Sequence, residues 1–196
     1  MMQDVAIAPD NRVLDASRRT LRRFGLQGLT TERIAQEAGI SRVTLHRRGI
    51  TKDVILETLT ERAITSYRDA LWPVMTAPGT GRERLELALQ RLCEVAEDQL
   101  ELLVALRSQT DAIFHEESDG EALTRTEFTE PLERLLRDGA ADGTLRETGY
   151  EEMATVLFNL VGWTYVHMRT GHRWAPDRAR GAILDVVMTG LLPRAG

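Results

Sequence analysis

Apolar residues recur at intervals of three and four along most of this chain, which is the spacing of one face of an α-helix. Long stretches lack glycine and proline and only 5% of the residues are aromatic, so the pattern predicts an all-helical protein. Glycines, prolines and short polar runs divide it into segments. Helices are predicted over residues 10–24, 31–38, 41–47, 51–71, 82–115 (two helices), 121–139, 150–170 and 177–191, with Pro73 and Pro131 expected to end, kink or split theirs.

The second and third predicted helices are short. Thr31 is expected to cap the second helix, and Gly39 to end it, because a left-handed residue costs least at glycine. Ser41 is expected to cap the third helix, in which Leu45 is the one large apolar residue. Since one apolar anchor contributes little core, the other side chains of this helix must serve another purpose. Two short helices joined by a tight turn indicate a DNA-binding helix-turn-helix, whose second helix enters a major groove about 12 Å wide.

The first three helices are expected to share a small hydrophobic core. A unit of ~50 residues is marginal alone, so this core is expected to lean on the rest of the chain. The predicted core residues are Leu14, Leu21, Phe24, Leu29, Ile34, Ala38, Ile40 and Leu45.

A family resemblance is carried by the run T-T-x-x-I-A-x-x-A-G-I-S-x-x-T-L-x-R, followed by T-K-D, in residues 30–53. It resembles the N-terminal domain of TetR-family transcriptional regulators, and the helical remainder fits this family. The resemblance implies an all-α protein, with an arm and a three-helix helix-turn-helix DNA-binding domain in residues 1–53. Residues 54–196 are then a helical effector-binding and dimerisation domain. The implied function is that of a repressor released from its operator by a small ligand, and the mostly aromatic and aliphatic candidate residues of the effector site favour a largely apolar one.

The resemblance also assigns roles within the motif. Arg42, Val43 and Thr44 stand at the exposed start of the recognition helix, where side chains meet base edges. Hydroxyls at helix starts suit phosphate oxygens, and basic side chains add charge. The phosphate-contacting group is expected to comprise Thr30, Thr31, Ser41, His46, Arg47 and Lys52.

Two residues depart from the family pattern. His46 stands where the family usually has a tyrosine that contacts the DNA backbone, and an imidazole still donates a hydrogen bond. Gly49 stands where the family usually has an aromatic residue that anchors the recognition helix, so Ile50 is the substitute anchor. These departures put the target sequence and the fine geometry in question.

The charge distribution agrees with a DNA-binding head, although the whole chain of 196 residues has a net charge of −5. Residues 11–53 hold nine arginines and one lysine against four acids, a net charge of +6, whereas residues 54–196 have a net charge of −9. The single cysteine, Cys93, fits a reducing cytoplasm. The N-terminus has no features of a signal peptide, and no uncharged run reaches the ~20 residues that span a membrane.

The last two predicted helices are too apolar for a monomer to cover. Residues 153–168 are apolar on nearly every face, and residues 183–191 repeat this pattern. A two-fold homodimer is the simplest arrangement that covers both helices. The expected interface residues are Leu157, Leu160, Val161, Thr164, Ile183 and Val187.

An effector site is the family's expectation for the C-terminal part. Large or polar residues at mostly apolar helix positions are its candidates, since ligand pockets are mostly apolar with few polar groups. They are Trp72, Met75, Arg107, Phe114, Phe128, Trp163 and His167, of which the aromatic ones also fit a plain core.

Three functions compete on the sequence alone. A ligand-responsive DNA-binding repressor explains both the basic head and the motif. An enzyme lacks candidate residues, because no phosphate loop, nucleophile motif or paired-histidine metal motif is present, and no cofactor is expected. A dimeric helical binding or scaffold protein with impaired DNA binding stays open because of His46 and Gly49.

Overall fold

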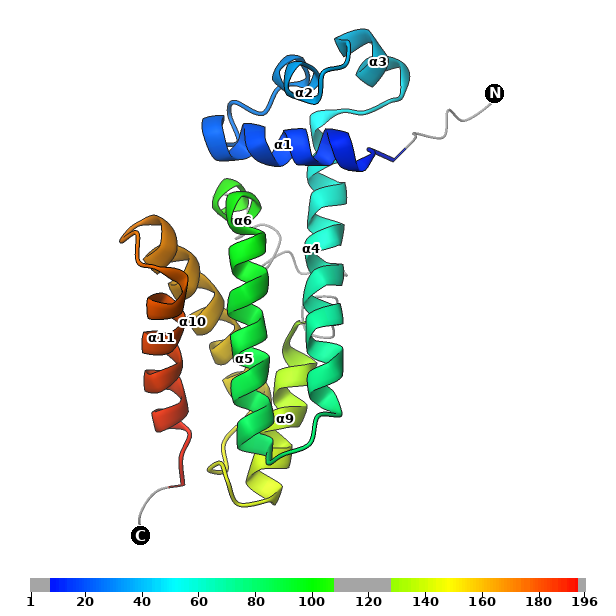
Figure 1. The fold of residues 1–196 in the computed structure, drawn as a ribbon. Helices are drawn as coiled ribbons and strands as arrows, with labels where there is room; N and C mark the ends of the chain where they lie inside the picture. The colour runs from blue at the N-terminus through cyan, green and yellow to red at the C-terminus, as the bar shows by residue number, and fades with distance from the viewer. Residues whose placement is uncertain (1–7, 108–127, 194–196) are drawn as a thin grey trace. The chain divides into compact units, whose positions relative to one another are not determined.

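The computed structural model describes residues 8–107 and 128–193, and every regular element among them is a helix (Figure 1). The all-helical prediction is therefore confirmed. The elements are α1 (Asn11–Phe24), α2 (Thr31–Ala38), α3 (Arg42–Arg47), α4 (Lys52–Met75), α5 (Gly81–Asp98), α6 (Leu100–Leu106), α9 (Glu130–Ala141), α10 (Tyr150–Thr170) and α11 (Pro176–Gly190).

The chain folds into two compact units. The first unit comprises Met1–Ala63 and Leu100–Gln109, and the second comprises Ile64–Gln99 and Thr110–Gly196. Compactness thus groups α6 and the first half of α4 with the three N-terminal helices. The functional division after residue 53 remains a prediction.

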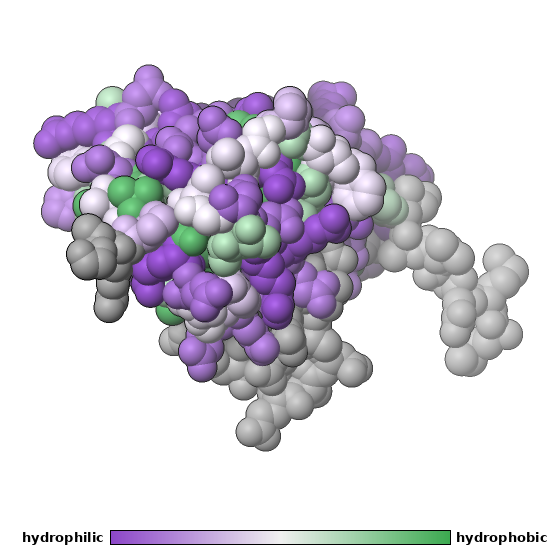
Figure 2. Space-filling view, turned by 90° about the horizontal axis from the view of Figure 1, so that it is seen from below, coloured by the Kyte–Doolittle hydropathy of each residue, from purple (hydrophilic) through white to green (hydrophobic). Residues whose placement is uncertain are grey.

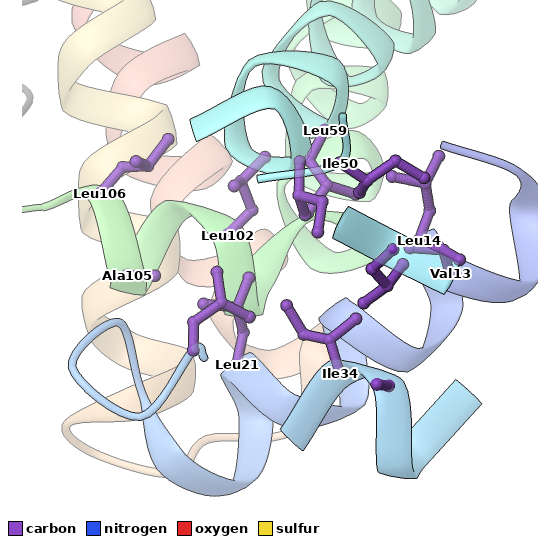
Figure 3. Packing of buried hydrophobic residues seen from close by; sticks show 13 residues of the cluster. Val13, Leu14, Leu21, Ile34, Ile50, Leu59, Leu102, Ala105 and Leu106 are labelled. Carbon is purple, nitrogen blue, oxygen red and sulfur yellow. The ribbon is translucent and has the colours of Figure 1, made fainter. Parts of the chain in front are cut away.

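A hydrophobic core holds the first unit together (Figure 3). Leu14, Leu21 and Ile34 are buried there, as the helical spacing predicts, and so is Leu45 of α3. The core continues into α4 and α6, which supply Leu59 and Leu102 among others. The expectation that the small head leans on later parts of the chain is confirmed, since three residues of α6 complete its core: Leu102, Ala105 and Leu106.

Phe24 is not part of this core, and the prediction that it points inward is wrong. Its side chain is 44% exposed. The guanidinium of Arg33 lies over the ring, 4.6 Å from its centroid, and Arg33 also donates to the carbonyl of Gly28 at 2.9 Å. The cation–π contact covers the ring from outside, so Phe24 packs under an arginine rather than among aliphatic side chains.

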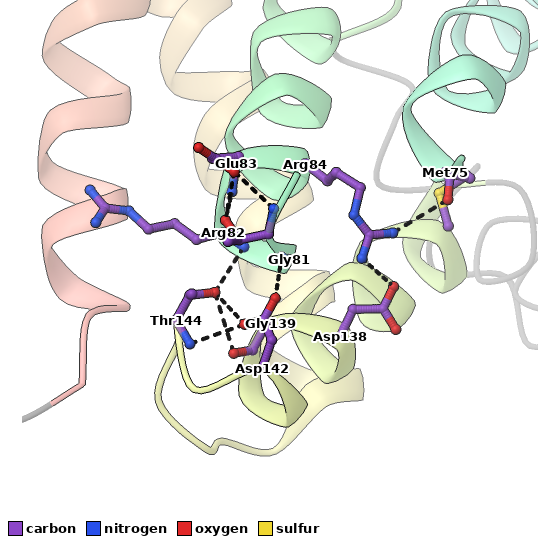
Figure 4. Close-up of polar contacts among 10 residues, drawn as sticks. Met75, Gly81, Arg82, Glu83, Arg84, Asp138, Gly139, Asp142 and Thr144 are labelled. Carbon is purple, nitrogen blue, oxygen red and sulfur yellow. Dashed lines mark hydrogen bonds and ion pairs between the residues drawn. The ribbon is translucent and has the colours of Figure 1, made fainter. Parts of the chain in front are cut away.

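In the second unit, α5 packs against α9, α10 and α11. The start of α5 meets the end of α9 closely, because a side chain at Gly81 would come within 2.1 Å of the Gly139 backbone nitrogen. The N–H of Gly81 donates to the Asp142 carboxylate at 2.6 Å, and this bond holds the pKa of Asp142 below its usual range (Figure 4). Arg84 pairs with Asp138 at 3.0 Å beside this junction. Thr80 and Glu83 form the capping box of α5, and Asp142, 61 residues away, accepts the first N–H of the helix.

The predicted helix boundaries need three corrections. Thr30, rather than Thr31, caps α2, since the N–H of Arg33 donates to the Thr30 hydroxyl at 3.3 Å. Pro73 lies inside the last turn of α4, which continues to Met75. Pro131 lies in the first turn of α9, where its missing N–H costs nothing, and among the described residues the α-helix predicted over 121–139 begins only at Glu130. The predicted helical segments 108–115 and 121–127 lie outside the described residues.

The surface shown in Figure 2 is mostly hydrophilic, with hydrophobic residues in small separate groups. Such scattered groups are ordinary for a protein surface in water. No helix within residues 8–107 and 128–193 is long and apolar enough to cross a membrane.

Candidate functional site

The turn between α2 and α3 is fixed by local backbone chemistry. Gly39 adopts a left-handed conformation with φ of 64° and ψ of 37°, and its N–H bonds back to the end of α2. The Ser41 hydroxyl accepts from the N–H of Thr44 at 3.1 Å and caps α3. Both roles agree with the sequence prediction. Because Ser41 and Gly39 flank a single residue, the direction of α3 is set within three positions of the end of α2.

Helix α3 presents nearly all of its side chains to solvent. Leu45 is its buried residue, whereas Arg42, Val43, His46 and Arg47 are exposed. Val43 is 74% exposed, so its methyl groups are accessible to a binding partner. A short helix held by one anchor and carrying cations and an exposed methyl pair is suited to enter a DNA major groove.

The departure at Gly49 is explained by the backbone. Gly49 has a positive φ of 67°, a conformation in which an aromatic side chain is strained. The next residue, Ile50, is 2% exposed and belongs to the core of the first unit. Its N–H donates to the Leu45 carbonyl at 3.1 Å, so Ile50 holds the end of α3 as the sequence predicted.

Several basic residues of the head are held by partners that the sequence did not indicate. The Lys52 ammonium donates to the carbonyl of Leu26 at 3.0 Å, so this side chain braces α4 against the turn after α1. Arg48 pairs with Asp10 at 3.2 Å. Arg47 is exposed and has no ion pair within the part of the chain that the structure describes. No spacing rule links these partners, which are 26 and 38 residues apart in the sequence.

Arg42 and Glu32 form another such pair. The Nη1 atom of Arg42 lies 2.8 Å from Oε1 of Glu32, and both side chains are largely exposed. The Thr31 hydroxyl donates to the other carboxylate oxygen at 3.4 Å. The predicted base-reading arginine therefore contacts an acid at the start of α2.

The candidate effector residues are spread over both units. Arg107 belongs to the first unit, and the others that the structure describes belong to the second. Trp72 is 74% exposed, His167 is exposed at the end of α10, and Trp163 and Met75 are partly buried. Phe114 lies outside the described residues. Their roles as ligand contacts remain predictions.

Phe128 is the candidate with the most developed surroundings. Its ring centroid lies 5.3 Å from that of Tyr67 and 5.0 Å from that of Phe158. The Tyr67 hydroxyl donates to the Phe128 carbonyl at 2.9 Å, and burial raises the pKa of Tyr67. Sequence reasoning missed Tyr67 and Phe158, because each alone is an ordinary apolar helix position.

Gln99 is a second polar feature that the sequence did not reveal. Its side chain is 5% exposed, and its Oε1 atom has no hydrogen-bond partner among the described residues. It stands at the end of α5 in register with the buried positions Leu92 and Ala96. The sequence did contain a signal for this burial, because Gln99 follows the buried Ala96 by three residues, which is the spacing of one helix face.

The candidate self-association residues divide into two groups. Leu160 is 46% exposed and Thr164 is partly exposed. Four others are buried within the chain, so their side chains serve the fold of the second unit: Leu157, Val161, Ile183 and Val187. A single chain does not cover α10 on every face, because Val156 and Leu160 are half exposed, and the prediction that a second copy covers the helix stays a prediction. Val186 of α11 is 71% exposed as well.

Comparison with known families gives a match over the head. Residues 13–59 match the family described as bacterial regulatory proteins, tetR family. This range contains α2, the turn, α3 and the residues predicted to contact DNA. No curated protein matches the sequence.

Solved structures resemble the whole chain. A TetR transcriptional regulator from Streptomyces coelicolor is 26% identical with a TM-score of 0.59, covering 94% of this chain and 99% of its own. The ketosteroid transcriptional regulator of Mycobacterium tuberculosis is 15% identical with a TM-score of 0.74, covering 98% and 100%. A regulator of the TetR/AcrR family from Thermobifida fusca is 18% identical with a TM-score of 0.69, covering 93% and 98%. These neighbours are transcriptional regulators rather than enzymes.

Proposed function

We propose that this chain, a DNA-binding transcriptional regulator of the TetR family, represses transcription as a homodimer on a two-fold operator and is released by a small, largely apolar ligand. Such a regulator acts in the cytoplasm, where bacterial DNA is accessible. The family membership rests on the head, and the ligand, the dimer and the sign of regulation are the proposed part.

The observation that carries the proposal is the exposure of α3. Its start is fixed by Ser41 and its middle by Leu45, and the side chains of Arg42 and Val43 are exposed where base edges would lie. An arginine forms a bidentate pair with guanine, and an aliphatic side chain contacts the thymine methyl group. The buried Ile50 keeps this helix anchored without an aromatic residue at position 49. This anchoring therefore weighs against the alternative of a scaffold protein with impaired DNA binding.

Selection from a library of duplexes with randomised bases tests the DNA-binding part. The expected product is a roughly palindromic site whose half-sites are about 34–36 Å apart, or a multiple of that distance. Arg42→Ala is expected to weaken operator binding by roughly 1–3 kcal/mol and to relax one base position per half-site. A variant that retains wild-type affinity and base preference would contradict the base-reading role of Arg42.

Ligand control is proposed to act through α4. This helix supplies residues 52–63 to the first unit and 64–75 to the second, so one continuous helix contributes to both. The aromatic cluster of Tyr67, Phe128 and Phe158 favours a largely apolar effector. A ligand that shifts α4 between two states changes DNA affinity only by its different affinity for those states.

Reciprocity makes this control testable. A compound library is titrated against the protein–DNA complex, with tryptophan fluorescence as the second measurement. Trp72→Ala or Trp163→Ala is expected to impair the response to the compound and to spare DNA binding. The operator must weaken ligand binding by the same factor as the ligand weakens operator binding. A releasing ligand that binds equally well with and without operator DNA excludes this mechanism.

A further inference from the structure

The ion pair between Glu32 and Arg42 connects the first turns of the two helices of the motif. Glu32 is the second residue of α2, and Arg42 is the first residue of α3. Their Oε1 and Nη1 atoms are 2.8 Å apart although both side chains are more than half exposed. The second oxygen of Glu32 accepts from Thr31, so one carboxylate holds two of the residues proposed to meet DNA.

The Glu32 carboxylate is charged at neutral pH. A bond from its own backbone N–H holds the pKa of Glu32 below its usual range, and the Arg42 charge and the threonine hydroxyls add to this effect. A negative charge at the DNA-facing end of the motif opposes the phosphates of an incoming duplex. Its presence at this place therefore reduces the affinity of the head for DNA of any sequence.

Two ordinary explanations do not account for the contact. An acid in the first turn favours a helix through the helix dipole, which explains Glu32 but not its pairing with the other helix. Ion pairs between exposed side chains contribute little to stability, so the pair is a weak fold determinant. What it does change is the freedom of the arginine, whose long side chain otherwise samples many rotamers.

We infer that Glu32 is a positioning residue that holds the Arg42 guanidinium for base reading and withholds it from phosphates, so that it raises sequence discrimination at the expense of affinity. The guanidinium has five N–H donors in a rigid fork. The bond to Glu32 engages Nη1, and further donors remain for the O6 and N7 acceptors of guanine. This inference rests on the proposed DNA-binding function.

The test compares wild-type protein, Glu32→Gln, Arg42→Ala and the double variant. Each is used to select from a randomised duplex library and is titrated with a duplex of arbitrary sequence. Glu32→Gln is expected to bind the arbitrary duplex about threefold more tightly, because one charge facing the phosphates is removed. It is expected to lose roughly three- to tenfold of its preference at the base that Arg42 reads. In the Arg42→Ala background the same change is expected to leave every base preference unaltered.

Glu37→Gln is the matched control. Glu37 is an exposed acid on the same helix, and it pairs with Arg19 of α1 at 2.6 Å instead of with α3. This variant is expected to retain the wild-type base preferences. Thermal unfolding of each variant checks that the head is folded.

Three outcomes overturn the inference. If Glu32→Gln discriminates between bases as well as the wild type does, Glu32 only stabilises α2 through the helix dipole. An equal change of base preference in the Arg42→Ala background means that Glu32 acts without Arg42. A wild-type protein that selects no sequence contradicts the proposed function itself, and the inference then falls with it.

Discussion

Lys52 donates a hydrogen bond from its ammonium group to the backbone carbonyl of Leu26, 3.0 Å away. The first residue of α4 is thereby attached to the turn that precedes the helix-turn-helix. Lys52→Ala removes a charged donor from this partly buried contact and leaves the Leu26 carbonyl with only the N–H of Leu29, at 3.2 Å. It is expected to lower the free energy of unfolding by about 1–3 kcal/mol in urea denaturation.

The Lys52→Ala variant also distinguishes a structural role of Lys52 from a role in binding DNA phosphates. If Lys52 also reaches DNA, Lys52→Ala weakens binding to all sequences alike and reduces the salt dependence by about one phosphate contact. Lys52→Arg, which keeps the charge, serves as the control in a fluorescence anisotropy titration at several salt concentrations. A destabilised variant with unchanged DNA binding would identify Lys52 as a purely structural residue.

Charges on the exposed apolar positions of α10 and α11 are expected to prevent self-association. Leu160→Glu and Val186→Asp place a charge where a half-exposed or exposed aliphatic side chain now stands. Burying an unpaired charge in an interface costs several kcal/mol, so light scattering should give monomers. Val104→Glu is the matched control, since Val104 is 45% exposed on α6 of the first unit. A wild-type protein that is itself a stable monomer would contradict the proposed dimer.

Replacing the buried Gln99 by leucine is expected to stabilise the protein. Its Oε1 atom is buried without a partner in residues 8–107 and 128–193, and removing such an atom recovers about 1–3 kcal/mol of its desolvation cost. The control is Gln90→Leu on the same helix, at a half-buried position, for which a change within about 0.5 kcal/mol is expected. If Gln99→Leu is stable and also loses the response to a releasing ligand, Gln99 is an acceptor for that ligand. A destabilised variant would show that the amide has a partner in solution.

Glu97 gives the second unit a dependence on pH. Arg169 donates to both of its carboxylate oxygens at 2.7 Å, and the Tyr165 hydroxyl donates at 3.0 Å. These bonds, that of Arg169 first, hold the pKa of Glu97 below its usual range. A carboxyl whose pKa is lower in the folded state stabilises the fold above its unfolded-state pKa. This contribution is lost as the pH falls through the folded-state pKa.

Glu97→Gln is therefore expected to lower the free energy of unfolding by about 1.5–3 kcal/mol at pH 7. The difference from wild type should close in acid, as the pH passes below the folded-state pKa of Glu97. Glu86→Gln is the control, because Glu86 is a half-buried acid of the same helix without an ion pair among the described residues. A difference that stays constant from pH 7 to acid would mean that the carboxylate charge is not its source.

The tertiary structure decided every contact between residues far apart in the chain. The pairing of Arg42 with Glu32 and of Lys52 with Leu26 follows no sequence spacing, because the fold of the head brings these residues together. The side of α10 that is buried was also undecided, since an apolar helix has no polar face to orient it. Packing within the second unit buries Leu157 and Val161 and leaves Val156 and Leu160 at the surface.

The sequence by itself determined the helical class and the helix-turn-helix. Both depend on neighbours within a few positions: helical spacing, a serine cap at Ser41 and a left-handed glycine at Gly39. Ile50 was likewise identified as the anchor of α3, because position 49 lacks a side chain. Phe24 was wrongly predicted to lie in the core because its helical spacing matches that of the core residues. In the structure, the guanidinium of Arg33 from α2 lies over its ring instead. Local periodicity fixes which elements form, and only long-range packing decides which side chains they bury or pair.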